Sequence, residues 1–151
     1  MGRVAGIDYG TVRIGIAMTD PDQTLASPWE NYSRRSEKKD AEFFAQLARE
    51  ERVTRFVVGL PLYPSGDESE KSREARVFGT WLEKTTGVPV EFFDERYSSK
   101  FADELLEPLT AKKRKARRDM LAAYIILTSW LESQPKNRPS TAPNPDSPEI
   151  V

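Results

Sequence analysis

Runs of hydrophobic and polar residues divide the chain into predicted strands and helices. Short apolar or alternating segments predict strands, whereas apolar positions three or four residues apart predict helices. On these patterns we expect strands near residues 3–8, 13–18, 25–32, 56–60 and 88–94, and helices at 40–52, 69–86 and 120–132. We also expect a short helix between residues 98 and 106, and a loop or helix lead-in at 112–118.

The order of these elements predicts the fold class. The first two strands form a hairpin that the third strand extends, and helices separate the strands that follow. Parallel strands need crossover connections, which helices normally provide. The apolar run at residues 56–60 is typical of a strand buried on both faces. We therefore expect an α/β fold with a mixed five-stranded sheet, antiparallel in the first hairpin and third strand and then parallel, flanked by helices.

The length of the chain and its prolines predict one domain and a tail. A chain of 151 residues is long enough to bury a hydrophobic core. Prolines recur from Pro135 onward, in a segment with little apolar surface to bury. We expect one domain at residues 1–133 and a disordered, proline-rich tail at 134–151. No apolar run approaches the roughly 20 residues that span a bilayer, and no secretory signal is evident, so we expect a cytoplasmic protein without membrane contacts.

Two residue types are missing, and their absence excludes several kinds of active site. The chain contains neither Cys nor His. Disulfides, thiolate nucleophiles, Ser-His-Asp triads and His- or Cys-ligated zinc are therefore excluded. An enzyme of this composition must work with carboxylates, hydroxyls, Lys, Arg or a bound metal. Carboxylate oxygens favour hard cations such as Mg²⁺ or Mn²⁺.

Acidic residues at the ends of predicted elements are candidates for such a site. Asp8 ends the first strand, at an edge where α/β proteins bind ligands, although it also suits a turn. Asp94 and Glu95 close the fifth strand; alternation sends them to opposite faces and leaves open which one faces a site. Asp119 begins the last predicted helix, where an N-cap is an equally good interpretation. Three such acids could hold two divalent ions for phosphodiester cleavage.

A local basic cluster contrasts with the net charge of −1. It comprises Lys112, Lys113, Arg114, Lys115, Arg117 and Arg118. Nucleic-acid binding depends on such local clusters more than on the total charge, although a solvated charge run is an alternative. Arg13 and Arg96 each lie near a candidate acid, where they could orient a phosphate or pair with a carboxylate.

These segments, taken in order, resemble the motifs of the YqgF family, also called RuvX. Residues 4–17 resemble its opening signature and residues 57–62 its middle motif. Residues 94–99 resemble its Asp-Glu-Arg motif, with Ser98 and Ser99 where threonines are frequent. Residues 112–115 and 119–127 resemble its closing motif. The resemblance covers roughly residues 1–133 and leaves out the tail.

The resemblance implies an RNase H-like fold and a phosphodiester nuclease. It implies that Asp8, Glu95 and Asp119 are the catalytic residues and bind Mg²⁺ or Mn²⁺. We expect substrate contacts from Arg13, Arg96, Ser98, Lys112, Lys113, Arg114 and Lys115. The implied substrate is a structured ribosomal RNA precursor, cleaved during maturation of the 16S 5′ end, with a ribosomal particle as a further partner.

Other interpretations remain open at this stage. An older view of the family is a Holliday-junction resolvase acting on branched DNA, for which a homodimer rather than a monomer would be favoured by symmetry. A non-catalytic nucleic-acid-binding or ribosome-assembly module is a second alternative. An actin- or sugar-kinase-type phosphotransferase shares an Asp-x-Gly-Thr-like hairpin, but it needs two such domains and a second phosphate loop, which we do not find.

Overall fold

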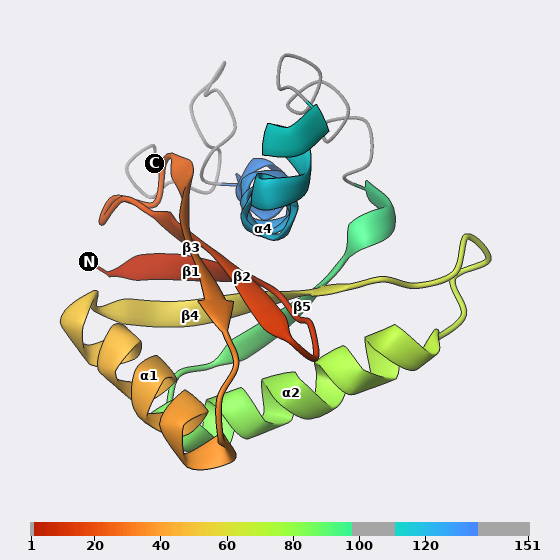
Figure 1. The fold of residues 1–151 in the computed structure, drawn as a ribbon. Coiled ribbons are helices and arrows are strands. Elements are labelled where there is room, and N and C mark those ends of the chain that lie inside the picture. Colours follow the sequence, from red (N-terminus) through yellow and green to blue (C-terminus); the bar gives the residue numbers. More distant parts are fainter. Residues whose placement is uncertain (1, 98–110, 136–151) are drawn as a thin grey trace, which may run out of the picture.

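Five strands form one sheet between two helical layers in the computed structural model, which describes residues 2–97 and 111–135 (Figure 1). Within these ranges, the side chains of residues 97 and 111–119 are left out of the description. The elements are β1 (Arg3–Asp8), β2 (Arg13–Thr19), β3 (Ala26–Ser33), α1 (Glu37–Glu50), β4 (Val53–Leu60), α2 (Glu70–Thr86), β5 (Val90–Asp94), the 3₁₀ turn η1 (Glu95–Tyr97) and α4 (Ala111–Ser133).

The sheet has the strand order β3-β2-β1-β4-β5. The pairs β1–β2 and β2–β3 are antiparallel, whereas β1–β4 and β4–β5 are parallel. This arrangement confirms the predicted mixed sheet. Because β1, β4 and β5 run in the same direction, their carboxyl ends meet at one edge, on the right in Figure 1.

Helices cover both faces of the sheet and define two hydrophobic layers (Figure 1). On one face, α1 and α2 pack against a cluster that includes Ile7, Phe44 and Phe56. On the other, α4 packs against Val4 and Val57; we call this the α4 face. The helix comes close to β1, because a Cβ placed on Gly6 would lie 2.7 Å from the Leu127 Cβ.

Local capping explains where the first two helices begin and end. Ser36 accepts a hydrogen bond from the Lys39 N–H and starts α1 at Glu37, earlier than the predicted residue 40. Ser69 and Ser72 bond each other's backbone N–H groups in a capping box that starts α2. Gly87 ends α2 in the left-handed conformation, at a φ of 75°, as its position in the sequence predicted.

The last helix corrects two predictions. α4 begins at Ala111, so the loop or lead-in predicted at residues 112–118 was wrong, as was Asp119 as the residue that starts the helix. Lys and Arg are good helix formers, and no Gly or Pro interrupts the chain between Ala111 and Asp119. The basic run therefore continues the helix.

Two sequence predictions lie outside the described residues. The short helix expected between residues 98 and 106 is one, and the tail from residue 136 onward is the other. The boundary between domain and tail thus stays a prediction. In the described part of the chain, none of the helices combines the length and hydrophobicity needed to cross a membrane.

Candidate active site

Asp8 lies at the carboxyl end of β1, on the α4 face. Val4 packs in the α4 layer and Gly6 lies against Leu127. Strand alternation places Asp8 on the same face as these two residues. Its pairing partner in β2 is Gly15, so no bulky side chain stands beside it there. Asp8 is half-buried at the edge of the sheet.

Glu95 reaches the same face from the end of β5. In β5, Phe93 packs in the α4 layer, and Gly59 of β4 faces α4 because Val57, two residues earlier, packs there. A Cβ placed on Gly59 of β4 would lie 2.6 Å from Glu95 Oε2 and 2.5 Å from Ile126 Cδ1. The missing side chain of Gly59 therefore provides the space that the Glu95 carboxylate occupies. We call the grouping of Asp8, Gly59 and Glu95 the acidic edge.

Burial and two charged neighbours shift the pKa of Glu95 at the acidic edge. Burial raises the pKa of Glu95 above its usual value of 4.5; the Lys71 ammonium opposes this rise and the Asp94 carboxylate adds to it. A divalent cation beside this carboxylate would favour its ionised form. Lys71 belongs to the first turn of α2, and the sequence offered no signal that it lies near the site.

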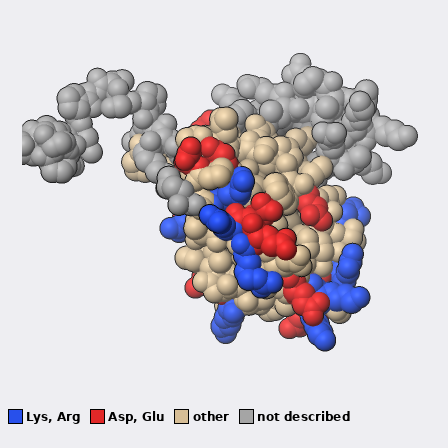
Figure 2. All heavy atoms as spheres, turned by 90° about the vertical axis from the view of Figure 1, so that its left-hand side faces the viewer, with Lys and Arg blue, Asp and Glu red and all other residues tan. Residues whose placement is uncertain are grey.

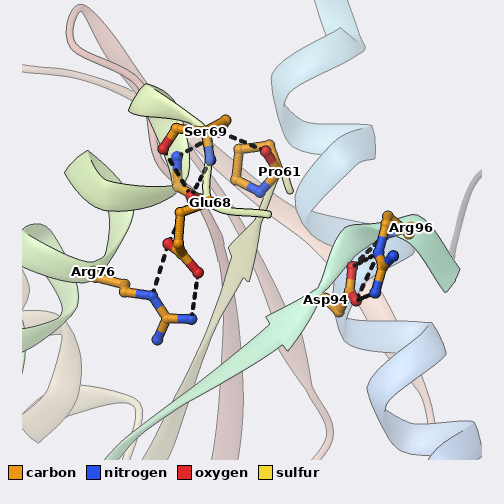
Figure 3. Close-up of polar contacts among 7 residues, drawn as sticks. Pro61, Glu68, Ser69, Arg76, Asp94 and Arg96 are labelled. Carbon is orange, nitrogen blue, oxygen red and sulfur yellow. Dashed lines mark hydrogen bonds and ion pairs between the residues drawn. The ribbon is translucent and has the colours of Figure 1, made fainter. Parts of the chain in front are cut away.

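Asp94 faces away from this site, toward a basic partner. Its carboxylate accepts two hydrogen bonds from Arg96 through Oδ2, at 2.6 Å from Nη2 and 2.9 Å from Nε (Figure 3). The hydrogen bonds from Arg96 hold the pKa of Asp94 below 3.8. Of the two adjacent acids, Glu95 and not Asp94 shares a face with Asp8.

Of the other residues predicted for the site, some have described side chains and others do not. Arg13 is exposed at the start of β2, two residues before Gly15, and so lies on the α4 face. Asp119 lies in α4, one turn before Ala123, whose carbonyl oxygen would be 3.0 Å from a Cβ on Gly6. Ser98 lies outside the described residues, as do the side chains of Asp119 and residues 112–115. Among the side chains that are described, no three acids form a group that could hold a metal ion.

A cavity of about 450 Å³ lies away from the acidic edge, between α1 and α2. Its lining includes Tyr9, Arg34, Phe78 and Trp81. Arg34 is already engaged there, since it donates hydrogen bonds to Tyr9 and to Asp40. The candidate acids are on the opposite face, so this cavity does not mark the same site.

The end of the sheet opposite the acidic edge carries mixed charges (Figure 2). Arg3 there lies 3.8 Å from Glu51, and Arg55 pairs with Glu91 at 3.3 Å. Acidic and basic side chains are interspersed on the described part of this surface, so their fields largely cancel. It offers little attraction to a polyanion.

Sequence comparison identifies proteins that are similar to this chain. A family model described as RuvX, Holliday junction resolvase, matches residues 2–133. A Rhodopirellula baltica protein named "Putative pre-16S rRNA nuclease" is 48% identical over 134 residues, covering 87% of this chain and 78% of the relative. A protein of the same name from Anaeromyxobacter sp. (strain K) is 43% identical over 132 residues, covering 86% and 96%.

Solved structures share the fold at low sequence identity. Thermus thermophilus RuvC in complex with a Holliday junction substrate aligns with a TM-score of 0.55 and 14% identity, covering 91% of this chain and 98% of the RuvC chain. The fowlpox virus Holliday junction resolvase aligns with a TM-score of 0.50 and 12% identity, covering 87% and 99%. These likenesses confirm the predicted RNase H-like fold. Together with the match over residues 2–133, they confirm the resemblance found in the motifs: the chain belongs to the RuvX family.

Proposed function

We propose that this protein is a metal-dependent nuclease that hydrolyses phosphodiester bonds in the 5′-end processing of the 16S ribosomal RNA precursor. One observation carries the chemistry: β1 and β5 bring Asp8 and Glu95 to the same face and the same edge of the sheet. The names of the relatives at 48% and 43% identity suggest the substrate.

The residues at the acidic edge fit a divalent cation. Asp8, Glu95 and Asp119 would hold Mg²⁺ or Mn²⁺ through oxygen ligands, in a chain with neither His nor Cys. Burial raises the pKa of Glu95, and a divalent cation beside it would favour the ionised form. When bound, the metal would activate water and offset charge on the phosphate.

Basic and hydroxyl groups of the chain would hold the substrate. Arg13, exposed on the α4 face, would contact a phosphate near Asp8. Lys112, Lys113, Arg114 and Lys115 follow each other in the first turns of α4 and would add further phosphate contacts, with Ser98 as a hydroxyl donor. Affinity should then fall steeply with salt, because each phosphate contact releases counterions. The protein would act in the cytoplasm, on free precursor or on a ribosomal particle, as a monomer or homodimer.

The test is cleavage of a labelled 16S precursor fragment by purified full-length protein, with Mg²⁺, with Mn²⁺ and with a chelator. Asp8→Asn and Glu95→Gln should each lower the rate at least about a hundredfold, because each removes an anionic metal ligand. Glu91→Gln is the matched control, since Glu91 lies on the same face, in the strand β5 that leads to Glu95, but accepts a hydrogen bond from Trp130 at 3.0 Å, away from the acidic edge.

Two results would contradict the proposal. One is cleavage that persists in the chelator, and the other is cleavage that survives both substitutions at the acidic edge. If the protein binds the precursor but never cleaves it, the non-catalytic binding module becomes the better interpretation.

A Holliday junction is the second candidate substrate, favoured by the description of the family. A synthetic four-way DNA junction belongs in the same assay, with the same metals and variants. If the protein cleaved the junction symmetrically, and with a higher kcat/KM than the RNA precursor, branched DNA would be its substrate. It would also require two active sites, and hence a dimer in solution.

A further inference from the structure

One guanidinium group connects the end of β5 to the loop between β4 and α2. Arg96 grips both oxygens of Asp94, and its Nη1 donates to the Pro64 carbonyl oxygen at 3.2 Å. The backbone N–H of Arg96 also donates to Asp94 Oδ1 at 2.9 Å. A fork of this kind fixes the relative orientation of the two side chains. We call this set of contacts the Arg96 clamp.

The loop at residues 61–69 is folded at its tip. The Tyr63 N–H donates to the Asp67 carbonyl at 3.0 Å, and the Gly66 N–H donates to the Tyr63 carbonyl at 2.8 Å. Gly66 has a φ of 95°, in the region that favours glycine, and a Cβ placed on it would lie 3.3 Å from Arg96 Nη1. Arg96 therefore packs directly against the turn at the tip of this loop.

The base of the loop is attached separately to α2 (Figure 3). The Ser69 hydroxyl donates to the Pro61 carbonyl oxygen at 2.6 Å. Glu68 accepts hydrogen bonds from Arg76 at 2.9 Å and 3.0 Å, and a third from Ser72. These contacts of the base do not involve Arg96, whereas the tip contacts Arg96 at the Pro64 carbonyl oxygen and at Gly66.

In the sequence, Glu95 lies between Asp94 and Arg96, the two residues of the clamp. Asp94 and Arg96 close a short turn around it, and the Arg96 N–H to Asp94 bond starts the 3₁₀ turn η1 at this point. A closed turn fixes the direction in which the Glu95 side chain leaves the backbone. That direction leads to the space above Gly59.

We propose that Arg96 is a positioning residue, which with Asp94 holds the tip of the 61–69 loop against β5 and directs Glu95 over Gly59. Its guanidinium is committed to contacts within the chain, so it acts through Glu95 and the loop. The sequence left two roles open for Arg96, a phosphate contact and a pairing with a carboxylate, and Arg96 pairs with Asp94. The consequence for cleavage rests on the proposed nuclease function, but the effect on the loop does not.

Hydrogen exchange of the loop amides tests the clamp without any activity assay. In Arg96→Gln and in Asp94→Asn, the amides of Tyr63 and Gly66 should exchange at least about tenfold faster than in the wild type. Arg96→Lys keeps the charge but loses the planar fork, so it should behave in the same way. Arg55→Gln is the matched control: it removes the Arg55–Glu91 pair between β4 and β5, far from the 61–69 loop, and loop exchange should not change.

Kinetics on the RNA precursor separate positioning from direct contact. Positioning predicts that Asp94→Asn and Arg96→Gln both lower kcat with little change in KM, and that the double variant is no worse than either single variant. Direct phosphate binding predicts that only Arg96→Gln raises KM, because Asp94→Asn would free the guanidinium. That pattern would overturn the proposal.

Loop exchange at the wild-type rate in both variants would also overturn it, whether or not the protein cleaves RNA. If the variants showed faster loop exchange but the wild type had no nuclease activity, the role of the clamp in holding the loop would stand and only the proposed function would be wrong. Unchanged exchange elsewhere in β4 and β5 establishes that the variants are folded.

Discussion

Asp40 and Glu95 are two carboxylates that the fold withdraws from water on opposite sides of the sheet, and their pKa values move in opposite directions. Asp40 lies in α1 and is 1% exposed. Burial alone would raise its pKa, but hydrogen bonds from Tyr32, the Arg35 N–H and Arg34 hold it below 3.8. For Glu95, burial dominates and the pKa rises.

The difference lies in what surrounds each acid. Asp40 accepts hydrogen bonds from the Tyr32 hydroxyl at 2.7 Å, the Arg35 N–H at 2.9 Å and Arg34 Nε at 3.2 Å. In return, burial and the Asp40 carboxylate raise the pKa of Tyr32 to about 12. For Glu95, which lies beside Gly59 and near Ile126, burial outweighs the opposing effect of the Lys71 ammonium. Where hydrogen bonds outweigh burial, the charged form of the acid is favoured and stabilises the fold; where burial dominates, the neutral form is favoured until a cation binds.

The largest expected effect on stability is at Asp40. Asp40→Ala should lower the free energy of unfolding by about 3 kcal/mol, because it leaves a buried hydroxyl and a guanidinium without their acceptor. Chemical denaturation measures this loss, and cleavage per folded molecule should remain at the wild-type level. Asp20→Ala is a control, since Asp20 makes similar turn contacts near the surface and should cost less. If folded Asp40→Ala lost cleavage, the distinction between a carboxylate that stabilises the fold and one that serves the site would be wrong.

Gly59→Ala should affect both stability and activity. The added methyl group would overlap Glu95 and Ile126, which should cost about 1–3 kcal/mol of stability. Displacement of the Glu95 carboxylate should lower the cleavage rate about a hundredfold. Gly79→Ala is the matched control, because its Cβ would lie 2.5 Å from Phe92 Cζ on the other face. Equal activity losses in the two variants would indicate a general packing defect.

The pH dependence of stability should have opposite signs at the two acids, with the smaller effect at Glu95. Because the fold raises the pKa of Glu95, ionising it costs stability as the pH rises above 4.5. Glu95→Gln should therefore be more stable than the wild type near neutral pH and equal to it below pH 4.5. Denaturation of metal-free protein across this range measures the difference.

The contribution of Asp40 to stability should have the opposite pH dependence. Its lowered pKa means that it stabilises the fold above pH 3.8, and that this stability is lost as the pH falls through its pKa in the folded protein. The gap between the wild type and Asp40→Ala should therefore close on acidification. On acidification, the stability of the wild type should therefore fall relative to Asp40→Ala and rise relative to Glu95→Gln. If it moved in the same direction relative to both variants, the contrast between the two carboxylates would be wrong.

The sequence by itself determined the sheet and most of its helices. Alternation and apolar runs predicted all five strands, and the absence of Cys and His restricted the chemistry to acids, bases and hard cations. These features are local, because side-chain periodicity and capping depend on residues a few positions apart. The start of α4 was missed because a good N-cap residue at position 119 competed with a helix-forming basic run.

Only the tertiary structure decided which acid belongs to the edge and what its neighbours do. Parity separated Asp94 from Glu95 but did not say which face α4 would cover; the packing of Phe93 against α4 answers this. The space beside Gly59 and the contact of Arg96 with Pro64 join residues more than 30 positions apart. Such contacts depend on how strands and helices pack, which no local pattern in the sequence encodes.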